Sequence, residues 1–367
     1  YPVYSGQTAN NGIMGMVDHY AYDYGEDGCI FTTTVGAKAM HVSHLKGKFC
    51  LSQNCMIIYP VKNIYVRYAY YYLKSLFGYE RSLIPDHMQP SFRVEDFHTY
   101  RFLNPSSNEQ KEIADYLDEK TSRIDLLLQK LGRQKELLVE KRSALINKAV
   151  TRGLNPDVKM KKTGIDWLSE VPKNWNIKKL KYSCKNLVDK NNRLGLLPVI
   201  DLEHVVSCEG RLSMNRKYLP FVENSNGRLF FEKGCVLYGK LRPYLKKVIF
   251  ANFGGYCSSE FFVLQTDQVS GFLFYLCLSD IFNSLANSSA YGVKMPRTSW
   301  DIMGYLLFAF PEPFEQKQIA NSLDKQTAKI DLLQSKTDRQ IELLKEYRAS
   351  LITSAVTGQI KITSSSN

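Results

Sequence analysis

Two stretches of this chain, 206 residues apart, are closely similar. Residues 105–118 read PSSNEQKEIADYLD, and residues 311–324 read PEPFEQKQIANSLD. Identical residues recur at the same offset, without a gap, as far as Thr151 and Thr357. A repeat at a fixed offset is the mark of a duplicated structural unit. We therefore predict two similar halves, each with a globular domain followed by one copy of this segment.

The repeated segments have the pattern of long helices, because apolar residues return at near-heptad spacing between charged ones. The two stripes are Ile113, Leu117, Ile124, Leu131, Leu138 and Leu145, and Ile319, Leu323, Ile330, Thr337, Leu344 and Leu351. Since neither stripe is stable in water, we expect the helices to pair as an antiparallel coiled coil, which would relate the halves by a pseudo-twofold axis. The first stripe spans about 50 Å of helix, longer than one ~34 Å turn of duplex DNA.

The rest of the sequence predicts globular domains of the α+β class. Runs such as GCIFTTTV (28–35) and GCVLYGKL (234–241) are typical of strands, and YVRYAYYYLKSLF (65–77) is typical of a helix. The expected order is a first domain at 1–104, a helix at 105–152, a packed linker at 153–175, a second domain at 176–310, a helix at 311–359 and a tail at 360–367. The repeat offset places the start of the first domain before residue 1, and we expect roughly forty residues of it to precede this sequence.

Charge favours a polyanionic partner. Lysine and arginine number 48 against 36 acidic residues, which gives a net charge of +12 and points to nucleic acid, although a basic protein without such a partner remains an alternative. No stretch approaches the ~20 apolar residues of a membrane span, and the start does not resemble a signal peptide. We expect a cytoplasmic protein with no membrane contact. The eight cysteines form no CxxC pair, so we expect reduced thiols.

The usual catalytic and metal signatures are absent or weak. The sequence has no GxGxxG and no GxxxxGK[ST], and Asn104-Pro105-Ser106-Ser107 does not supply the Asn/Asp-Pro-Pro-aromatic turn of amino-methyltransferases. Pro85-Asp86 followed by Asp118-Glu119-Lys120 matches a nuclease motif only as text, because its second part lies in the helical stripe. A zinc spacing at His41, His44, Cys50 and Cys55 is not kept in the second half. We predict no catalytic residue, no metal and no cofactor in this chain.

Two loops of the second domain have the composition of a DNA-contacting surface. Tyr238–Lys247 and Tyr291–Arg297 interleave cations with aromatic and turn residues, and such cations bind phosphates, or guanine when they reach base edges, while glutamine and asparagine suit adenine. The candidates in the first domain are Lys38, Gln53, Gln89, Ser91 and Arg93. Those in the second are Tyr238, Lys240, Arg242, Tyr244, Lys246, Lys247, Ser258, Lys294 and Arg297. The alternative interpretation is a solvated basic hairpin.

The whole pattern resembles the specificity subunit of type I restriction-modification systems. The resemblance lies in two variable domains, each followed by a helix that opens Pro-x-x-x-Glu-Gln-x-x-Ile-Ala. It extends to Gly164-Ile165-Asp166-Trp167-Leu168 and Val171-Pro172-Lys173-Asn174-Trp175 before the second domain. Essentially the whole chain is covered.

The resemblance implies a role in recognition and no enzymatic activity of this chain. The two domains would be target-recognition domains that bind a bipartite site in double-stranded DNA, with the helices setting the spacer. Partners would be two methyltransferase (modification) subunits and restriction subunits, which would carry S-adenosylmethionine, ATP and Mg²⁺ for adenine methylation and cleavage. Two other interpretations stay open: the DNA-reading part of a longer enzyme, and a coiled-coil assembly protein that does not bind DNA.

Overall fold

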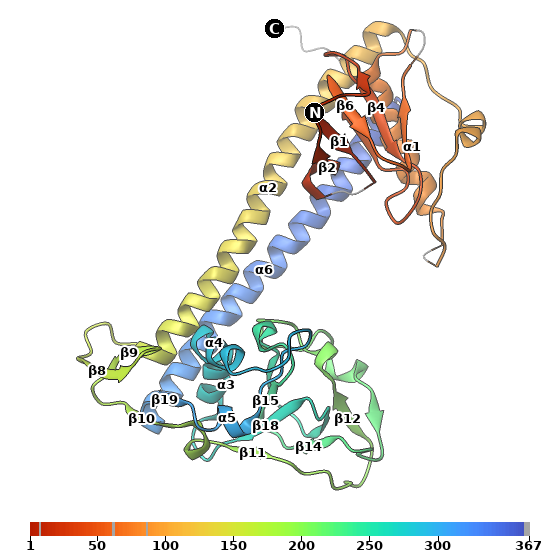
Figure 1. Ribbon diagram of the computed structural model, residues 1–367. Helices are drawn as coiled ribbons and strands as arrows, with labels where there is room; N and C mark the ends of the chain where they lie inside the picture. Colours follow the sequence, from red (N-terminus) through yellow and green to blue (C-terminus); the bar gives the residue numbers. More distant parts are fainter. Residues whose placement is uncertain (7–8, 61–62, 86, 363–367) are drawn as a thin grey trace. The chain divides into compact units, whose positions relative to one another are not determined.

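The structure is a computed structural model that describes residues 1–6, 9–60, 63–85 and 87–362. The chain forms two compact units. Unit 1 comprises Tyr1–Arg133 and Lys336–Asn367, and unit 2 comprises Gln134–Ser335. Two long helices, α2 (Ser107–Arg152) and α6 (Pro313–Val356), each contribute one end to unit 1 and the other to unit 2 (Figure 1).

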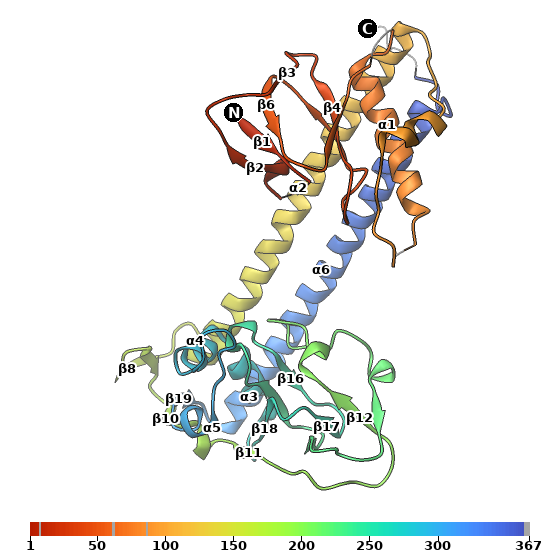
Figure 2. The ribbon, with the colours of Figure 1, turned by 45° about the vertical axis from the view of Figure 1, so that its right-hand side comes forward.

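Among its described residues, unit 1 contains two small sheets and one further α-helix (Figure 2). Its elements are β1 (Pro2–Tyr4), β2 (Ile13–Met16), β3 (Tyr22–Asp23), β4 (Cys29–Thr33), β5 (Val42–Leu45), β6 (Lys48–Leu51), β7 (Cys55–Ile58) and α1 (Val66–Ser82), with short 3-10 turns at Ala9–Gly12 and Val94–Thr99. The strand orders are β2-β1-β6-β3 and β5-β4-β7. Helix α1 packs on β4 and β5, with Phe77 in the cluster that it shares with them. Tyr68 and Tyr71 of the same helix are buried in a second cluster, with residues of α2 and α6, so α1 joins two parts of the core of this unit.

Unit 2 repeats this arrangement and adds further strands. Its strands are β8 (Met160–Ile165), β9 (Leu168–Pro172), β10 (Asn176–Lys179), β11 (Lys185–Leu187), β12 (Leu197–Ile200), β13 (Phe221–Val222), β14 (Leu229–Phe231), β15 (Val236–Gly239), β16 (Val248–Phe250), β17 (Gly255–Cys257), β18 (Phe261–Gln265) and β19 (Leu307–Phe310). Its helices are α3 (Ser270–Leu278), α4 (Asp280–Ser288) and α5 (Trp300–Met303). The two main sheets have the orders β13-β12-β17-β14 and β11-β18-β15-β16.

The two units share an unusual strand pairing. In unit 1, β1 runs parallel to β6, with Val3 opposite Cys50. In unit 2, β12 runs parallel to β17, with Val199 opposite Tyr256. Cys50 and Tyr256 are equivalent in the sequence repeat. The duplication that the helices indicate therefore extends through the variable domains, and the α+β class is confirmed.

Within each unit, α2 and α6 pack against one another in antiparallel directions. In unit 1, Arg348 of α6 pairs with Asp125 of α2, with Nε and Oδ1 3.0 Å apart. In unit 2, Arg142 of α2 pairs with Asp331 of α6. The two arginines are equivalent in the repeat, as are the two aspartates. This reciprocal exchange is what a twofold-related contact requires, and it confirms the predicted antiparallel pairing.

Both helices begin two residues inside the predicted bounds of 105–152 and 311–359; α2 ends at the predicted Arg152, and α6 ends at Val356, three residues before the predicted end. Ser106 caps α2, because the Glu109 amide donates to Ser106 Oγ (3.3 Å) and the Ser106 amide donates to Glu109 Oε2 (2.9 Å). Pro313 is the first residue of α6, where its missing N–H costs nothing. Gly153 and Gly358, with φ of 74° and 72°, follow the two C-terminal ends.

The segment between α2 and the second globular part is ordered. It contains the β8–β9 hairpin, and Trp175 at its end is fully buried in the core of unit 2. The Trp175 indole donates to Glu315 Oε1 of α6 (3.0 Å). Trp167, in the turn between β8 and β9, is 42% exposed. In the described ranges, no helix has the length and apolar character needed to cross a membrane.

Candidate nucleic-acid interface

The basic loop of unit 2 connects β15 to β16 and is held by its backbone. The Lys240 amide donates to the Glu260 carbonyl (2.8 Å), the Arg242 amide donates to the Pro296 carbonyl (2.7 Å), and the Thr298 amide donates to the Lys240 carbonyl (3.1 Å). These three hydrogen bonds join the loop to the start of β18 and to the segment before α5. The two basic stretches singled out in the sequence therefore lie side by side.

Unit 1 contains the same three hydrogen bonds. The Thr34 amide donates to the Asn54 carbonyl (2.9 Å), the Gly36 amide donates to the Pro90 carbonyl (3.1 Å), and the Phe92 amide donates to the Thr34 carbonyl (2.7 Å). Each donor and each acceptor is displaced by 206 residues from its counterpart in unit 2. We call this set of three hydrogen bonds the loop frame.

An isolated strand bridge accompanies the loop frame in both units. Val35 pairs with Ser91 in unit 1, and Leu241 pairs with Arg297 in unit 2, again at the repeat offset. Because the backbone is fixed in the same way, equivalent side chains start from equivalent positions. Those side chains nevertheless differ, with Ser91 replaced by Arg297 and Gly36 by Arg242. The two units thus hold different chemical groups on one scaffold.

Four of the predicted cations of unit 2 have partners within the unit. Lys240 Nζ donates to the Ser259 carbonyl (2.5 Å) and Lys247 Nζ donates to the Leu202 carbonyl (2.6 Å). Arg297 Nη2 lies 3.1 Å from Glu260 Oε1, and Lys246 is paired with Asp280. Burial, reinforced by the charge of Arg297, lowers the pKa of Lys240 below its usual value. These side chains shape the loop as well as charging it.

Other predicted residues of unit 2 are exposed. Arg242, Tyr244 and Lys294 lie at the surface, and within the described part of the chain no side-chain partner is found for Arg242 or Lys294. Arg242 adopts a left-handed conformation with φ of 49°, which is costly for a side chain and persists only where the surroundings impose it. Arg242 and Lys294 are therefore the cations most available to an anionic ligand.

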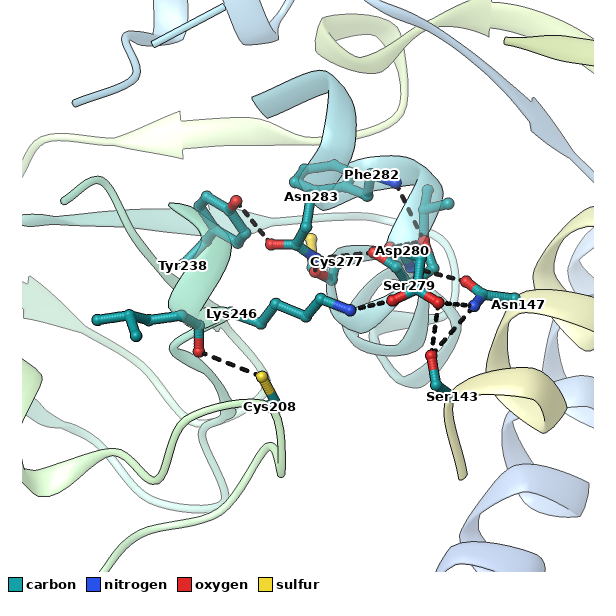
Figure 3. A network of polar contacts seen from close by, with 12 residues as sticks. Ser143, Asn147, Cys208, Tyr238, Lys246, Cys277, Ser279, Asp280, Phe282 and Asn283 are labelled. Atoms are coloured by element: carbon teal, nitrogen blue, oxygen red, sulfur yellow. Dashed lines mark hydrogen bonds and ion pairs between the residues drawn. The ribbon is translucent and has the colours of Figure 1, made fainter. Parts of the chain in front are cut away.

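Two predicted contact residues have structural roles. Tyr238 is buried, its hydroxyl donates to Asn283 Oδ1 (2.9 Å), and burial raises its pKa well above the usual value (Figure 3). The prediction of a DNA contact is wrong for Tyr238, because β15 is covered on both faces. Ser258 is half-buried, and its Oγ accepts a hydrogen bond from the Glu260 amide (3.2 Å), which fixes the start of β18.

Lys246 belongs to a polar network around the start of α4 (Figure 3). Its ammonium pairs with Asp280, which also accepts hydrogen bonds from Ser143 Oγ (2.5 Å) and from Asn147 Nδ2, both on α2. The Asp280 amide donates to Asn147 Oδ1 (2.6 Å). Burial alone would raise the pKa of Asp280, but the hydrogen bonds from Lys246 and Ser143 outweigh it and lower the pKa. The network joins the end of the basic loop to α2.

The predicted residues of unit 1 are all exposed. Lys38 lies in the loop that the frame holds, and Ser91 lies in the bridge opposite Val35. Gln89 precedes Pro90 of the frame and helps to line a cavity of about 510 Å³. Gln53 lies in the turn between β6 and β7, next to Asn54 of the frame. Arg93 lies two residues after Ser91. All five predicted residues of unit 1 therefore lie within two residues of the loop frame in the sequence.

Sequence reasoning missed Lys190 and Glu260. Lys190 is exposed, and its charge contributes to the lowered pKa of Lys240, so it lies close to the loop. Glu260 is half-buried between the two basic loops. Lys190 has a local signal, because it stands in the polar turn Asp189-Lys190-Asn191-Asn192-Arg193. Glu260 has none, because a lone acidic residue before a strand is common.

The residues of the weak zinc and nuclease patterns have other partners. His44 Nε2 lies 2.8 Å from the Asp27 carbonyl, and His44 Nδ1 lies 3.1 Å from Arg67 Nη1. Arg67 also pairs with Asp118. Asp86 lies outside the described residues. Among the residues that are described, no group of three or more His, Cys, Asp or Glu side chains has a metal-binding arrangement.

Comparisons with known proteins agree with the resemblance found in the sequence. Residues 1–136 match the family described as type I restriction modification DNA specificity domain. The chain is 21% identical over 348 residues to the specificity subunit of the type I restriction enzyme EcoDI of Escherichia coli, covering 89% of this chain and 77% of that protein. It is 24% identical over 312 residues to the specificity subunit of the type I restriction enzyme MjaVIII of Methanocaldococcus jannaschii, and this match covers 80% of this chain and 70% of that protein.

Solved structures agree on the fold. A chain from a structure described as "Structural basis underlying complex assembly and conformational transition of the type I R-M system" has a TM-score of 0.73 at 12% identity, over 98% of this chain and 92% of that chain. The HsdS subunit from Thermoanaerobacter tengcongensis has a TM-score of 0.50 at 13% identity, over 94% of this chain and 84% of that chain.

The family match and these relatives point to one family. The resemblance predicted from the sequence is confirmed: the chain carries a type I restriction modification DNA specificity domain in residues 1–136 and is related over most of its length to the specificity subunits of type I restriction enzymes.

Proposed function

We propose that this chain is the sequence-specific DNA-binding subunit of a type I restriction-modification complex and is not itself an enzyme. Each unit reads one half of a bipartite target, through target-recognition domains at 1–104 and 176–310. The helices 105–152 and 311–359 set the spacer, with a linker at 153–175 and a tail at 360–367. The observation that carries the proposal is the duplicated loop frame, which presents different side chains from one backbone.

The side chains on the loop frame have different roles in binding. Arg242, Lys294, Lys190 and Lys38 are exposed cations and bind phosphates, where each contact releases counterions. Gln89 and Ser91, with Gln53 and Arg93, supply hydrogen-bonding groups to the first half-site. Tyr244 offers an exposed ring. Lys246 and Lys247 hold the loop in place through Asp280 and the Leu202 carbonyl.

The partners follow from the relatives, which are subunits of restriction enzymes. We propose that two methyltransferase subunits and restriction subunits bind this chain in the cytoplasm. Those subunits bind S-adenosylmethionine, ATP and Mg²⁺, and they methylate adenine and cleave DNA at the sites that this chain selects.

Salt-dependent DNA binding tests the proposal. The complex with its methyltransferase subunits is titrated with duplex DNA at a series of salt concentrations, and the slope of log affinity against log salt is compared between variants. Arg242→Ala and Lys294→Ala each reduce the magnitude of this negative slope by about 1, as the loss of one phosphate contact requires. Lys162→Ala, which removes an exposed cation of β8, leaves the slope unchanged.

Two results would contradict the proposal. One is binding to duplex DNA that is weak and independent of salt, which favours an assembly protein with no DNA role. The other is an equal reduction of the slope by Lys162→Ala, which would place the DNA-binding surface away from the loop frame.

A further inference from the structure

Arg297 of unit 2 is held more firmly than an ordinary surface arginine. Its amide donates to the Tyr291 carbonyl (2.9 Å) and its carbonyl accepts from the Tyr291 amide (3.0 Å), which closes a small hairpin. The bridge to Leu241 ties this hairpin to the basic loop. The backbone of Arg297 is thereby fixed on both sides before any ligand binds.

Glu260 holds the head of the same side chain. Glu260 Oε1 lies 3.1 Å from Arg297 Nη2, and the backbone of Glu260 is itself anchored by Ser258 Oγ and by the Lys240 amide. Both side chains are only partly exposed. A carboxylate that engages one edge of a planar guanidinium limits its rotation. In the described part of the chain, no hydrogen-bond partner is found for Nε or Nη1 of Arg297.

The chemistry of this pair suits one base. Glu260 contacts only Nη2, which has two N–H groups, so the second N–H of Nη2 stays available together with the neighbouring N–H of Nη1 or Nε. Two N–H groups along one edge of the guanidinium plane match the O6 and N7 acceptors at the major-groove edge of guanine. Adenine offers a donor at the position of O6 and is disfavoured. Lys240, whose charge interacts with that of Arg297, already donates to the Ser259 carbonyl, so Arg297 is the better placed of the two for a base edge.

Unit 1 provides an internal control. The positions equivalent to Arg297 and Glu260 are Ser91 and Asn54, on the same loop frame. Neither side chain carries a charge. A guanine preference that depends on Arg297 should therefore be confined to one half-site.

We propose that Arg297 selects a guanine in the half-site read by unit 2 and that Glu260 is its positioning residue. This inference rests on the proposed function, and it adds a base identity and a second residue to it. Glu260 acts through Arg297 and does not itself contact DNA.

The test uses the complex of the full chain with its methyltransferase subunits. The target is first identified by sequencing methylated adenines, and affinities are then measured for duplexes in which each base pair is replaced in turn. For the wild-type chain, replacing one G·C pair weakens binding about tenfold to a hundredfold. Arg297→Met, which keeps the aliphatic stem, removes the discrimination at that pair alone. Glu260→Gln weakens the discrimination at the same pair, and Ser91→Ala leaves it unchanged.

A modified base separates recognition from folding. Replacing the guanine by 7-deazaguanine removes only the N7 acceptor, and this change weakens binding of the wild-type chain but not of Arg297→Met. A variant that merely unfolds would lose affinity for every duplex alike. The inference is overturned if Arg297→Met discriminates bases at every position of the target as strongly as the wild-type chain does. It is also overturned if Glu260→Gln weakens discrimination at a different position. If the wild-type complex has no bipartite target at all, the proposed function itself fails.

Discussion

The two reciprocal ion pairs between α2 and α6 allow the cost of losing a buried pair to be compared with that of a more exposed pair in the same molecule. Arg142–Asp331 and Arg348–Asp125 have the same residue types at equivalent positions of the repeat. They differ in burial, because the side chain of Arg142 is 7% exposed and that of Arg348 is 20% exposed. Arg142 also donates to the Glu209 carbonyl (3.1 Å), so a loop of unit 2 covers it.

Removing each aspartate should therefore have unequal costs. Asp331→Ala removes the ion-pair partner of the buried Arg142 and leaves only the nearby charge of Glu209. Such a loss costs about 3–5 kcal/mol when both partners are buried, and we expect about 2–3 kcal/mol because Asp331 is itself 45% exposed and Glu209 remains. Asp125→Ala should cost less than about 1 kcal/mol, because Arg348 can turn toward water. The gain in helix propensity from aspartate to alanine is common to both variants and cancels.

Hydrogen exchange measured by mass spectrometry distinguishes the two variants. At about 1.4 kcal/mol for each factor of ten, Asp331→Ala should speed exchange of the slowest amides of α2 and α6 in unit 2 by about thirtyfold to a hundredfold. Asp125→Ala should speed those of unit 1 by less than about fivefold. An equal or larger effect of Asp125→Ala would refute the argument that burial decides the cost.

Three further outcomes follow from single sites. Burial and the charge of Arg67 lower the pKa of His44, so near pH 6.5 the unfolded chain binds a proton that the folded chain does not, and stability falls as the pH drops below 6.5. In His44→Gln the urea midpoint should therefore change less between pH 7.5 and pH 5.5 than in the wild type. An equal change in both proteins would argue against this role of His44. Cys208 is exposed, whereas burial raises the pKa of Cys184 to about 12. Alkylation of the native chain, followed by peptide mapping, should therefore find the label on Cys208 and not on Cys184. The reverse order of labelling would contradict the fold. Asp280→Ala should speed exchange at the start of α4 about tenfold through lost charged hydrogen bonds, with Asp301→Ala, in the first turn of α5, as the control that stays unchanged.

The fold could be predicted from the sequence where local pattern and duplication agree. The heptad stripe gives both helices, and the offset of 206 residues shows which segments are equivalent. The reciprocal pairing of Arg142 and Arg348 with the two aspartates follows from the same symmetry. It was not predicted, because the register of an antiparallel pair depends on the length of the chain folded between the helices.

The candidate site was predicted as a region more reliably than as a set of residues. The basic composition of 238–247 marks the loop, but composition does not show which cations are already paired. Lys246 and Lys247 have partners that stand far from them in the sequence, at Asp280 and Leu202. Composition also places Tyr238 at the surface, because it stands in the same basic stretch as Lys240, whereas β15 is buried along its whole length.

Glu260 shows why the remaining residues escaped prediction. Its importance comes from a distance of 3.1 Å to Arg297, across 37 residues of sequence that include two helices. Only the folded backbone creates that contact. The loop frame itself is equally hidden, because it consists of amide and carbonyl groups that every residue carries.

The central claim is that two equivalent units read two halves of one DNA target, and sequencing of methylated adenines tests it most directly. The chain is expressed with its methyltransferase subunit in a host without such systems, beside a variant in which Arg242, Lys294 and Arg297 are replaced by alanine. We predict a methylated motif with two specified halves around an unspecified spacer, and in the variant the loss of specificity in one half only. A host genome without a new methylated motif, or a variant in which both halves change together, would contradict the account.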